Sequence, residues 1–412
     1  MTSSPILLHD LGMVNVLGNN KAEIARRLFA GDTSGMGQRV GWMLDDSPAY
    51  VGQLDLALPA LPPIATNMRP WQSRNNQVLY AAYTQIEATV ERVRQRVGAE
   101  RIGVVLGTST SGVSHSEAAH RIHQHTGAFP ADFHYSQQEM GNPADFLARI
   151  AQVGGPCYTI STACTSSANA FISARALLHT DLCDAVLVGG VDTLCRMTVQ
   201  GFAALESTSI VQTNPLSRNR CGINIGEGAA LMLATRADLH LDNALGEQPT
   251  MVALYGGGES NDAYHMSAPD PTGMGAQRAM QAALQDARLA PAAITYVNLH
   301  ATATPKNDAM ESIAMHAVFA DGVPCSGTKP LTGHTLGATG VTEAGFCWLT
   351  LNAQFNPNNA LPPHIWDGEF DPELPPLNVV QLGQTFSTNT AYCMSNSFAF
   401  GGSNASLIFG RT

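Results

Sequence analysis

One cysteine of the chain, Cys164, lies at a position where enzymes commonly present a nucleophile. It stands between a short apolar run, residues 157–160, that is typical of a β-strand and a run of small residues from Ser166 that is typical of a helix. A thiol just before a helix lies in the field of unpaired backbone N–H groups, which stabilise a thiolate and can bind the oxyanion formed when a thioester is attacked. The short motif alone is equally compatible with a buried structural cysteine, so its interpretation depends on the residues that accompany it.

Two histidines further along the chain favour a catalytic role for Cys164. His300 lies in the sequence Asn-Leu-His-Ala-Thr-Ala-Thr, and His334 lies in the sequence Lys-Pro-Leu-Thr-Gly-His-Thr-Leu-Gly, which begins at Lys329. Either histidine alone would be an ordinary loop residue, and Lys329 alone would be a solvated surface residue. Their joint spacing favours a catalytic set, so Cys164, His300, His334 and Lys329 are the candidate catalytic residues.

Strand-like and helical segments alternate along the chain. Short apolar runs predict strands, and longer stretches with a helical period predict helices. This alternation predicts an α/β fold with buried sheets. Strands are expected at residues 102–107, 157–160, 185–189, 229–234, 251–255, 294–299 and 405–409, and helices at 76–97, 166–180, 275–286, 308–319 and 342–351.

The order of elements around Cys164 is echoed after about residue 250, which predicts an internal duplication. No hydrophilic linker or low-complexity stretch divides the 412 residues, so we expect two closely packed halves. The N-terminal half, which carries the nucleophile, is placed at residues 1–248, and the C-terminal half, which carries the histidine pair, at 249–412. The helix expected at 166–180 is apolar on nearly every face and should be buried all round.

The composition limits the kinds of partner. Hydrophobic residues make up 44% and charged residues only 13% of the chain, which suggests that a second subunit covers part of the surface. A formal net charge of −11 argues against nucleic acid as a ligand, because a phosphate backbone needs a basic face. An acidic partner would therefore require a local basic patch.

Cysteine and histidine spacing gives no metal motif. The eight cysteines include no C-x-x-C pair, so neither a zinc ribbon nor a thioredoxin-like motif is present, and reduced core cysteines fit a cytoplasmic protein. A further group of histidines lies in one polar segment without supporting cysteine or glutamate spacing, and these are expected on the surface rather than around a metal. They are His115, His120, His123, His125 and His134.

Neither an export signal nor a membrane span is expected from the sequence. Its first residues have no basic segment, and the apolar run there is broken by His9 and Asp10, which favours a first strand over a signal peptide. No run of about 18 uncharged apolar residues is present, so no membrane span is expected.

The motifs together resemble those of β-ketoacyl-acyl carrier protein synthases of the elongating, FabF-like type. The resemblance runs essentially from end to end and includes the nucleophile motif Thr-Ala-Cys at 162–164 and the closing motif Asn-Ser-Phe-Ala-Phe-Gly-Gly-Ser-Asn at 396–404. It also includes the central Gly-Glu-Gly-Ala at 226–229 and a loop at 262–270. The resemblance implies a thiolase-like fold, with five α-β-α-β-α layers built from two pseudo-symmetric halves, and a dimer.

The chemistry of such an enzyme assigns roles to the candidate residues. Joining two thioesters needs an acyl acceptor, a carbanion made by loss of CO2 from a malonyl unit, and stabilisation of negative oxygens. Cys164 would accept the acyl group, while His300 and His334 would hydrogen-bond the malonyl thioester and the enolate, each donor stabilising the transition state by about 3 kcal/mol. Lys329 would orient the histidines or stabilise charge. No nucleotide, flavin, metal or pyridoxal cofactor is required.

Other roles are implied by the family alone. The backbone N–H groups of Cys164 and Phe400 would form the oxyanion hole, although Phe400 could also be a core residue. Asp308 and Glu343 match acids of the family and are interpreted as supports for the catalytic groups, while Asp308 could instead cap the following helix. Thr110 lies in a segment that lines the acyl tunnel in the family.

The partner implied by the family is acyl carrier protein, an acidic helical protein. Arg69 and Arg74 lie in the segment that resembles the docking surface for it, and are predicted to form a local basic entrance. The resemblance leaves open whether the enzyme is a homodimer or a heterodimer with a related subunit of the chain-length-factor kind.

The sequence departs from the family pattern in three places. The family usually has glycine where this chain has Ala301 and Ala399, and commonly aspartate where it has Cys221. A Cβ at Ala399 puts in question the mobility of a loop for which glycine is suited. The segment 298–308 is closer to synthases of aryl polyene or type II polyketide clusters than to those of ordinary fatty-acid synthesis.

Two alternatives remain open from the sequence. A thiolase has the same fold and nucleophile but uses a second cysteine in a C-x-G setting, which Cys393-Met-Ser lacks. A non-catalytic subunit that shapes the pocket of a sister synthase typically lacks the nucleophile, so Cys164 and the two histidines favour the active member, alone or beside a degenerate partner.

Overall fold

The computed structural model describes residues 4–239, 250–387 and 391–412. Its main feature is an eleven-stranded sheet in the order β12-β11-β10-β13-β14-β9-β1-β8-β6-β4-β5. The strands of one half are β1 (Ile6–Val14), β4 (Ile102–Gly107), β5 (Cys157–Ile160), β6 (Ala185–Asp192) and β8 (Gly228–Arg236). Those of the other half are β9 (Val252–Asn261), β10 (Ile294–Leu299), β11 (Pro324–Gly327), β12 (Asn378–Val379), β13 (Tyr392–Phe398) and β14 (Ser403–Arg411).

The two halves of the sheet have the same connectivity. In the first, β1 and β8 pair antiparallel, β8 and β6 antiparallel, β6 and β4 parallel, and β4 and β5 parallel. In the second, β9 and β14, β14 and β13, β13 and β10, and β10 and β11 repeat this pattern in the same order. A short antiparallel pairing of β1 with β9 joins the halves. The predicted division between residues 248 and 249 lies outside the described residues and stays a prediction.

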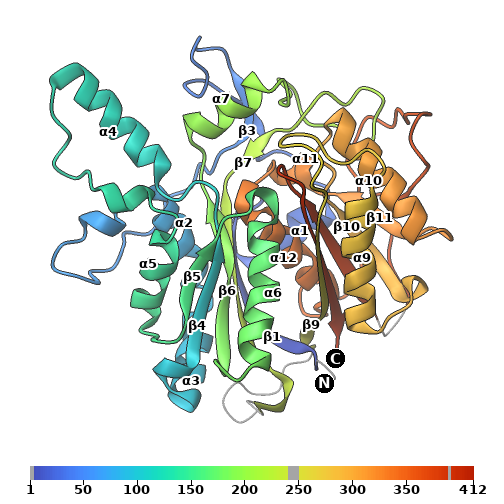
Figure 1. Cartoon of the computed structure of the whole chain (residues 1–412), viewed down its shortest axis with the longest axis horizontal. Coiled ribbons are helices and arrows are strands. Elements are labelled where there is room, and N and C mark those ends of the chain that lie inside the picture. Colours follow the sequence, from blue (N-terminus) through green and yellow to red (C-terminus); the bar gives the residue numbers. More distant parts are fainter. Residues whose placement is uncertain (1–3, 240–249, 388–390) are drawn as a thin grey trace.

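Helices complete five layers (Figure 1). Helices α6 (Ser166–His179) and α12 (Thr339–Leu351) lie between the halves, because each contacts strands of both. Helices α2 (Arg74–Tyr83) and α5 (Asn142–Ala151) cover the outer face of the first half, and α9 (Met274–Ala287) and α10 (Pro305–Val318) cover that of the second. This α-β-α-β-α arrangement is the predicted thiolase-like fold.

The central helices pack closely because their residues are small. A Cβ on Gly340 of α12 would lie 2.6 Å from the backbone nitrogen of Ala168 in α6, and a Cβ on Gly107 of β4 would lie 2.3 Å from that of Ser167. Only glycine permits such an approach. Helix α6 is buried through its first turns and reaches the surface only near its end, where Ala176 and His179 are exposed, so the prediction of a buried helix is confirmed for most of its length.

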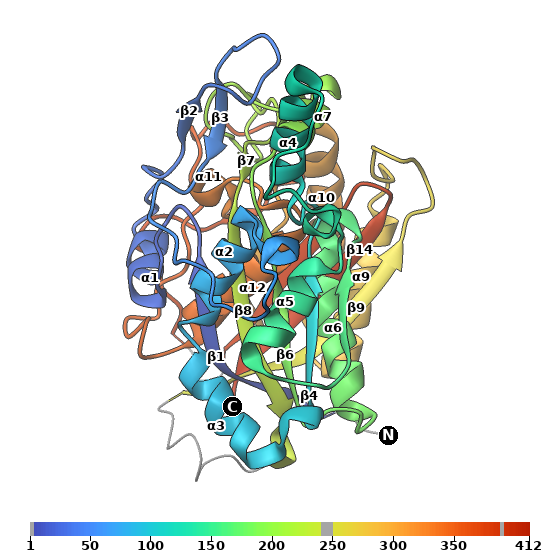
Figure 2. The ribbon, with the colours of Figure 1, turned by 90° about the vertical axis from the view of Figure 1, so that its left-hand side faces the viewer.

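Smaller elements surround the layers. Strands β2 (Gly37–Arg39), β3 (Ala49–Gly52) and β7 (Ile225–Gly226) form a second sheet, and α4 (Val113–Thr126) projects from the body above α2 and α5 (Figure 2). The structure also has the helices α1 (Lys21–Phe29), α3 (Glu87–Val97), α7 (Arg196–Ala204) and α11 (Lys329–Thr332). None of the helices in the described ranges is long and apolar enough to cross a membrane.

The histidines of the polar segment lie on and beside α4. His123 stacks on Phe129 with ring centroids 4.3 Å apart, and His120 meets the same ring edge-on at 5.1 Å. Within the described residues, none of the five belongs to a group with metal-ligand spacing. Aromatic packing therefore accounts for two of these side chains.

Candidate active site

Cys164 lies in a single turn of 3-10 helix, Ala163–Thr165, between β5 and the start of α6. Its side chain is buried, and burial raises the pKa of the thiol to about 11, while the charge of Lys329 and the backbone N–H groups of Phe400 and Cys164 lower it. These two N–H groups are those expected to form the oxyanion hole, and both act on the sulfur. The thiol is therefore the resting form, and donors for a negative charge are already in place.

His334 is fixed in one tautomer by its own loop. Its Nδ1 accepts a hydrogen bond from the backbone N–H of Leu336 at 3.1 Å, so the ring proton is on Nε2. That nitrogen lies 3.0 Å from the sulfur of Cys164. Because burial, and then the charge of Lys329, hold the pKa of His334 well below its usual value, the imidazole is a neutral donor directed at the nucleophile.

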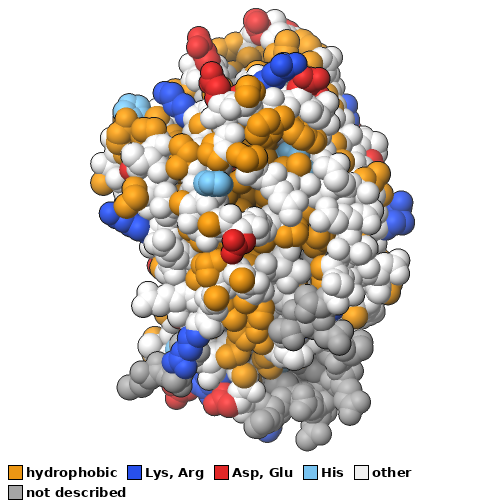
Figure 3. All heavy atoms as spheres, turned by 90° about the vertical axis from the view of Figure 1, so that its right-hand side faces the viewer, with side chains coloured by type: hydrophobic (Ala, Val, Ile, Leu, Met, Phe, Trp, Pro, Cys, Tyr) orange, Lys and Arg blue, Asp and Glu red, His pale blue; other side chains and the backbone are white. Residues whose placement is uncertain are grey.

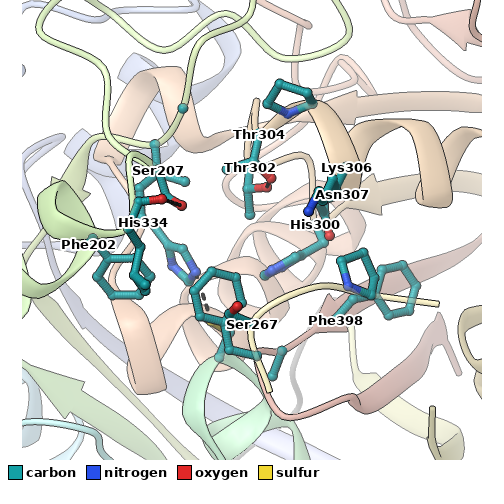
Figure 4. Close-up of a pocket in the computed structure, with 18 of the residues that line it drawn as sticks. Phe202, Ser207, Ser267, His300, Thr302, Thr304, Lys306, Asn307, His334 and Phe398 are labelled. Atoms are coloured by element: carbon teal, nitrogen blue, oxygen red, sulfur yellow. Dashed lines mark hydrogen bonds between the residues drawn. The ribbon is translucent and has the colours of Figure 1, made fainter. Parts of the chain in front are cut away.

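His300 faces the same space from the other side (Figure 4). The two imidazole rings are nearly perpendicular, with centroids 5.4 Å apart. Burial lowers the pKa of His300 well below its usual value, and the charge of Lys329 and the neighbouring His334 act in the same direction. Two neutral imidazoles therefore converge on one point near the sulfur.

A buried ion pair lies behind the histidines. The ammonium of Lys329 is 2.6 Å from Oε1 of Glu343, and both side chains are 2% exposed. The same ammonium donates to the backbone carbonyl of His300 and lies 3.5 Å from Nδ1 of its ring. Burial raises the pKa of Glu343 to about 7, and Lys329 lowers it. Lys329 thus contacts both the backbone and the ring of His300, and Glu343 balances its charge; the catalytic or supporting roles expected of these residues stay predictions.

The cysteine and both histidines have ligand atoms within 4.8 Å of one another, a spacing that a metal ion would accept. The hydrogen bonds argue against that use. A metal needs the lone pair of His334 Nε2, but Nδ1 already accepts an N–H and leaves the proton on Nε2. The arrangement is therefore built for hydrogen-bond donation.

Two carboxylates hold the loop that carries His300. Glu311 accepts the backbone N–H groups of His300 and Ala301, each at 2.7 Å. Asp308 accepts those of Ala303 at 3.0 Å and Leu216 at 2.8 Å. Both acids are buried, and burial raises their pKa values to about 8 and about 6 respectively. Asp308 therefore ties two loops together, which is more than capping its own helix.

The same bonds explain how alanine is accommodated where the family usually has glycine. Ala301 has φ of +38° and Ala303 has φ of +60°, a region that disfavours a side chain. Such strain persists only when the surroundings over-determine the conformation. Glu311, which the sequence analysis missed, supplies part of that restraint. Its signal was the spacing Asp-x-x-Glu on one face of a helix that directly follows the His300 loop.

Above these groups is a cavity of about 290 Å³. Its floor contains Cys164, His300 and His334, and Phe400 lies at its wall with its ring 5.5 Å from that of Phe202. Hydroxyl and amide side chains line the way out, namely Ser207, Ser267, Thr302, Thr304 and Asn307. The cavity can admit a narrow, hydrogen-bonding chain that ends at the sulfur.

The residues predicted for the acyl pocket and for carrier docking do not line this cavity. Thr110 is fully buried in the loop after β4, where its hydroxyl donates to the carboxylate of Asp192 at 2.7 Å. Arg74 forms an ion pair with the buried Glu227 at 2.6 Å, so it has a structural partner. Arg69 is exposed and donates to the carbonyl of Ala131 at 2.8 Å. The roles predicted for them remain predictions.

Comparison with known proteins agrees with this geometry. The family model described as β-ketoacyl synthase, N-terminal domain, matches residues 43–239, and the corresponding C-terminal domain matches residues 252–361. A curated relative, 3-oxoacyl-[acyl-carrier-protein] synthase 2 of Staphylococcus aureus, is 33% identical over 322 residues, which cover 76% of this chain and 77% of the relative. This chain belongs to the β-ketoacyl synthase family.

Other relatives match the synthase over its whole length. The 3-oxoacyl-[acyl-carrier-protein] synthase 2 of Coxiella burnetii is 29% identical over 100% of this chain and 99% of its own. A chain in the solved structure of the ketosynthase ApeO with its chain length factor ApeC, from Xenorhabdus doucetiae, is 43% identical, with a TM-score of 0.90 and coverage of 99% and 98%. A β-ketoacyl synthase from Burkholderia phymatum is 28% identical, with a TM-score of 0.83 and coverage of 99% and 100%.

Membership bears on the alternatives. The two relatives named 3-oxoacyl-[acyl-carrier-protein] synthase 2 are condensing enzymes of the acyltransferase class by name. A thiolase would use Cys393 as its second catalytic cysteine. Cys393 is buried in β13 and does not line the cavity. The synthase also keeps the cysteine and both histidines together, as an active member requires.

Proposed function

We propose that the synthase condenses an acyl group held as a thioester on Cys164 with malonyl-acyl carrier protein to give 3-oxoacyl-acyl carrier protein. The observation that carries this proposal is the convergence of two neutral imidazoles on a buried thiol, with His334 Nε2 3.0 Å from the sulfur. Neutral N–H donors suit an enolate oxygen, because they stabilise developing negative charge without transferring a proton first.

The steps follow from this arrangement. The sulfur of Cys164 attacks the acyl thioester, the N–H groups of Cys164 and Phe400 bind the oxyanion, and the carrier thiol leaves with the thiol proton. Malonyl-carrier protein then enters, and its carboxylate leaves as CO2 while His300 and His334 hold the resulting enolate oxygen. The enolate carbon attacks the acyl thioester, a carbon–carbon bond forms, and Cys164 leaves as thiolate.

We place the synthase in polyene or polyketide chain extension rather than in ordinary fatty-acid elongation. Its identity to a chain of the complex of the ketosynthase ApeO with the chain length factor ApeC is 43%, against 33% and 29% for the relatives named 3-oxoacyl-[acyl-carrier-protein] synthase 2. That complex supports a heterodimer with a chain-length-factor-like subunit. The eight cysteines are all unpaired in the structure, which suits a reducing cytoplasm.

The test is a competition among carrier-bound substrates. The enzyme, with and without a chain-length-factor-like subunit, is given malonyl-carrier protein and equal amounts of saturated, unsaturated and aryl-terminated acyl-carrier proteins. We expect 3-oxo products two carbons longer, formed fastest from the unsaturated and aryl-terminated substrates. A preference for saturated long chains would indicate a role in fatty-acid elongation instead. The absence of any extended product would contradict condensation.

Carrier docking is best tested at Arg69. Reversing its charge with Arg69→Glu should raise KM for carrier-bound substrate by about ten-fold and leave a small thioester mimic unaffected, because only the carrier is acidic. Arg74 is unsuitable, since its loss would leave the Glu227 carboxylate buried and unpaired. The matched control is Arg96→Glu on α3, an exposed arginine on another surface.

On the face drawn in Figure 3, basic side chains are few and scattered. If Arg69→Glu and Arg96→Glu change KM equally, or if the mimic suffers as much as the carrier substrate, the docking surface lies elsewhere.

Thr110 is predicted to limit the acyl pocket. Its hydroxyl is committed to Asp192, so Thr110→Ile both adds bulk and removes a donor from a buried carboxylate. We expect Thr110→Ile to show a narrower preference among acyl substrates, or a decrease in the length of its longest product, measured by intact mass. Thr110→Val, which removes the donor without adding a methylene, separates the two effects. Unchanged product length in Thr110→Ile would remove Thr110 from the pocket wall.

A further inference from the structure

One buried acid near the active site has no part in the scheme above. Asp192 ends β6, is fully buried, and lies among neutral donors. One carboxylate oxygen accepts the hydroxyls of Thr108 and Thr110, each at 2.7 Å, and the backbone N–H groups of Ser109 at 2.8 Å and Thr110 at 2.7 Å. Because each of these neighbours donates a hydrogen bond, this oxygen of Asp192 acts as an acceptor.

The second oxygen of Asp192 reaches the other half of the molecule. It accepts the backbone N–H of Ala338 at 3.1 Å. Ala338 ends the short 3-10 turn Leu336–Ala338 that lies between His334 and α12. The carboxylate thus connects the loop after β4 to the turn that follows His334.

That turn is closely packed and strained. A Cβ on Gly337 would lie 2.8 Å from the second oxygen of Asp192 and 2.7 Å from the carbonyl carbon of Thr108. Leu336 has φ of +53°, which is unfavourable for a residue with a branched side chain and persists only under external restraint. In this conformation the N–H of Leu336 points at Nδ1 of His334.

Two hydrogen bonds connect this turn to the nucleophile. The N–H of Leu336 keeps the ring proton of His334 on Nε2, and Nε2 lies 3.0 Å from the sulfur of Cys164. We propose that Asp192 is a positioning residue: its carboxylate holds the strained turn that fixes the tautomer and orientation of His334. This inference rests on the proposed role of His334 in the reaction.

The matched variants are Asp192→Asn and Thr108→Val. The asparagine keeps the shape but presents an NH2 group to N–H or O–H donors, so it releases either the loop or the turn. Thr108→Val removes one donor to the first oxygen and leaves the bond to Ala338 intact. Gly337→Ala perturbs the same turn in a second way. The added Cβ displaces the turn from the carboxylate of Asp192 and leaves this buried acid in place.

The first readout needs no substrate. Alkylation of Cys164 by iodoacetamide between pH 7 and 9, followed by peptide mass, reports the hydrogen bond from His334, because losing a donor raises the pKa of the thiol. We expect Asp192→Asn and Gly337→Ala to slow alkylation about ten-fold, the effect of a rise of about one unit in the pKa of the thiol, and we expect the same of His334→Ala. Thr108→Val should react at the wild-type rate. Melting temperatures of all variants identify any that fail to fold, and Gly337→Ala decides the question if Asp192→Asn is one of them.

The second readout is condensation in a single turnover, which should fall about 100-fold in Asp192→Asn, the loss expected when a catalytic group moves by about 1 Å. Equal alkylation rates in the wild type, Asp192→Asn and Gly337→Ala would overturn the proposal. If alkylation slows as expected but the wild-type enzyme does not condense at all, the link from Asp192 to Cys164 is supported and the proposed function is contradicted.

Discussion

Replacing Cys164 by alanine will abolish transfer of the acyl group from carrier protein to enzyme. The sulfur is the only nucleophilic atom of the described cavity that faces both the oxyanion N–H groups and the Nε2 of His334. Without it no covalent intermediate forms, and extension of the acyl chain should fall below detection. The measurement is the intact mass of the enzyme after incubation with acyl-carrier protein.

The control for this variant is Cys221→Ala. Cys221 is exposed, and its sulfur contacts Ser209 rather than the catalytic groups, so that variant should carry the acyl adduct and extend chains at the wild-type rate. An acyl adduct on Cys164→Ala, together with normal condensation, would show that the acyl group resides elsewhere.

Alanine at either catalytic histidine should impair condensation far more than acylation. Each imidazole is a neutral donor directed into the cavity, and removal of one donor to a developing oxyanion costs about 3 kcal/mol, or about 100-fold in rate. His334 also contacts the resting thiol, so His334→Ala should slow acylation several-fold. His300 has no such contact in the described structure, and His300→Ala should acylate nearly normally. Single-turnover rates for the two steps separate these effects.

Glutamine at the same positions provides the matched comparison, because its amide N–H reaches about as far from Cβ as the Nε2 of histidine does. His300→Gln and His334→Gln should recover part of the condensation lost in the alanine variants. Equal loss of acylation and condensation in both alanine variants would mean that the histidines only activate the cysteine.

The parts of the structure that follow from local sequence were predicted well. The apolar run before Cys164 and the small residues after it specify a strand, a turn and a buried helix, and β5 and α6 are found there. Likewise, the first strand is found at Ile6–Val14. These elements depend on periodicity and small side chains, which a sequence displays directly.

Features that depend on distant contacts were not predicted. The single helix expected at 76–97 is two helices, α2 and α3. The break allows the amide of Gln85 to accept the backbone N–H of Met13 at 3.1 Å and to donate to its carbonyl at 3.0 Å. That bond joins residues 72 positions apart, and nothing in the local period indicates it.

The candidate site shows the same division. Cys164, His300, His334 and Lys329 have a signature in sequence, and the structure brings all four together. The acids that hold their loops behave differently, because a buried carboxylate is recognised by the backbone N–H groups around it. Glu311 accepts such groups from a loop only ten and eleven residues before it, a spacing that the sequence displays. Asp192 accepts one from Ala338, which is 146 residues away, so only the folded chain reveals its role.

The most direct test of the account couples CO2 release to the acyl state of Cys164. Malonyl-carrier protein labelled in its free carboxylate is mixed with enzyme that has been acylated beforehand, and labelled CO2, the acyl-enzyme mass and the 3-oxoacyl product are followed together. We expect one CO2 for each product formed, with the adduct on Cys164 lost at the same rate. A 3-oxoacyl product that accumulates while the Cys164 adduct persists, or without release of labelled CO2, would contradict it.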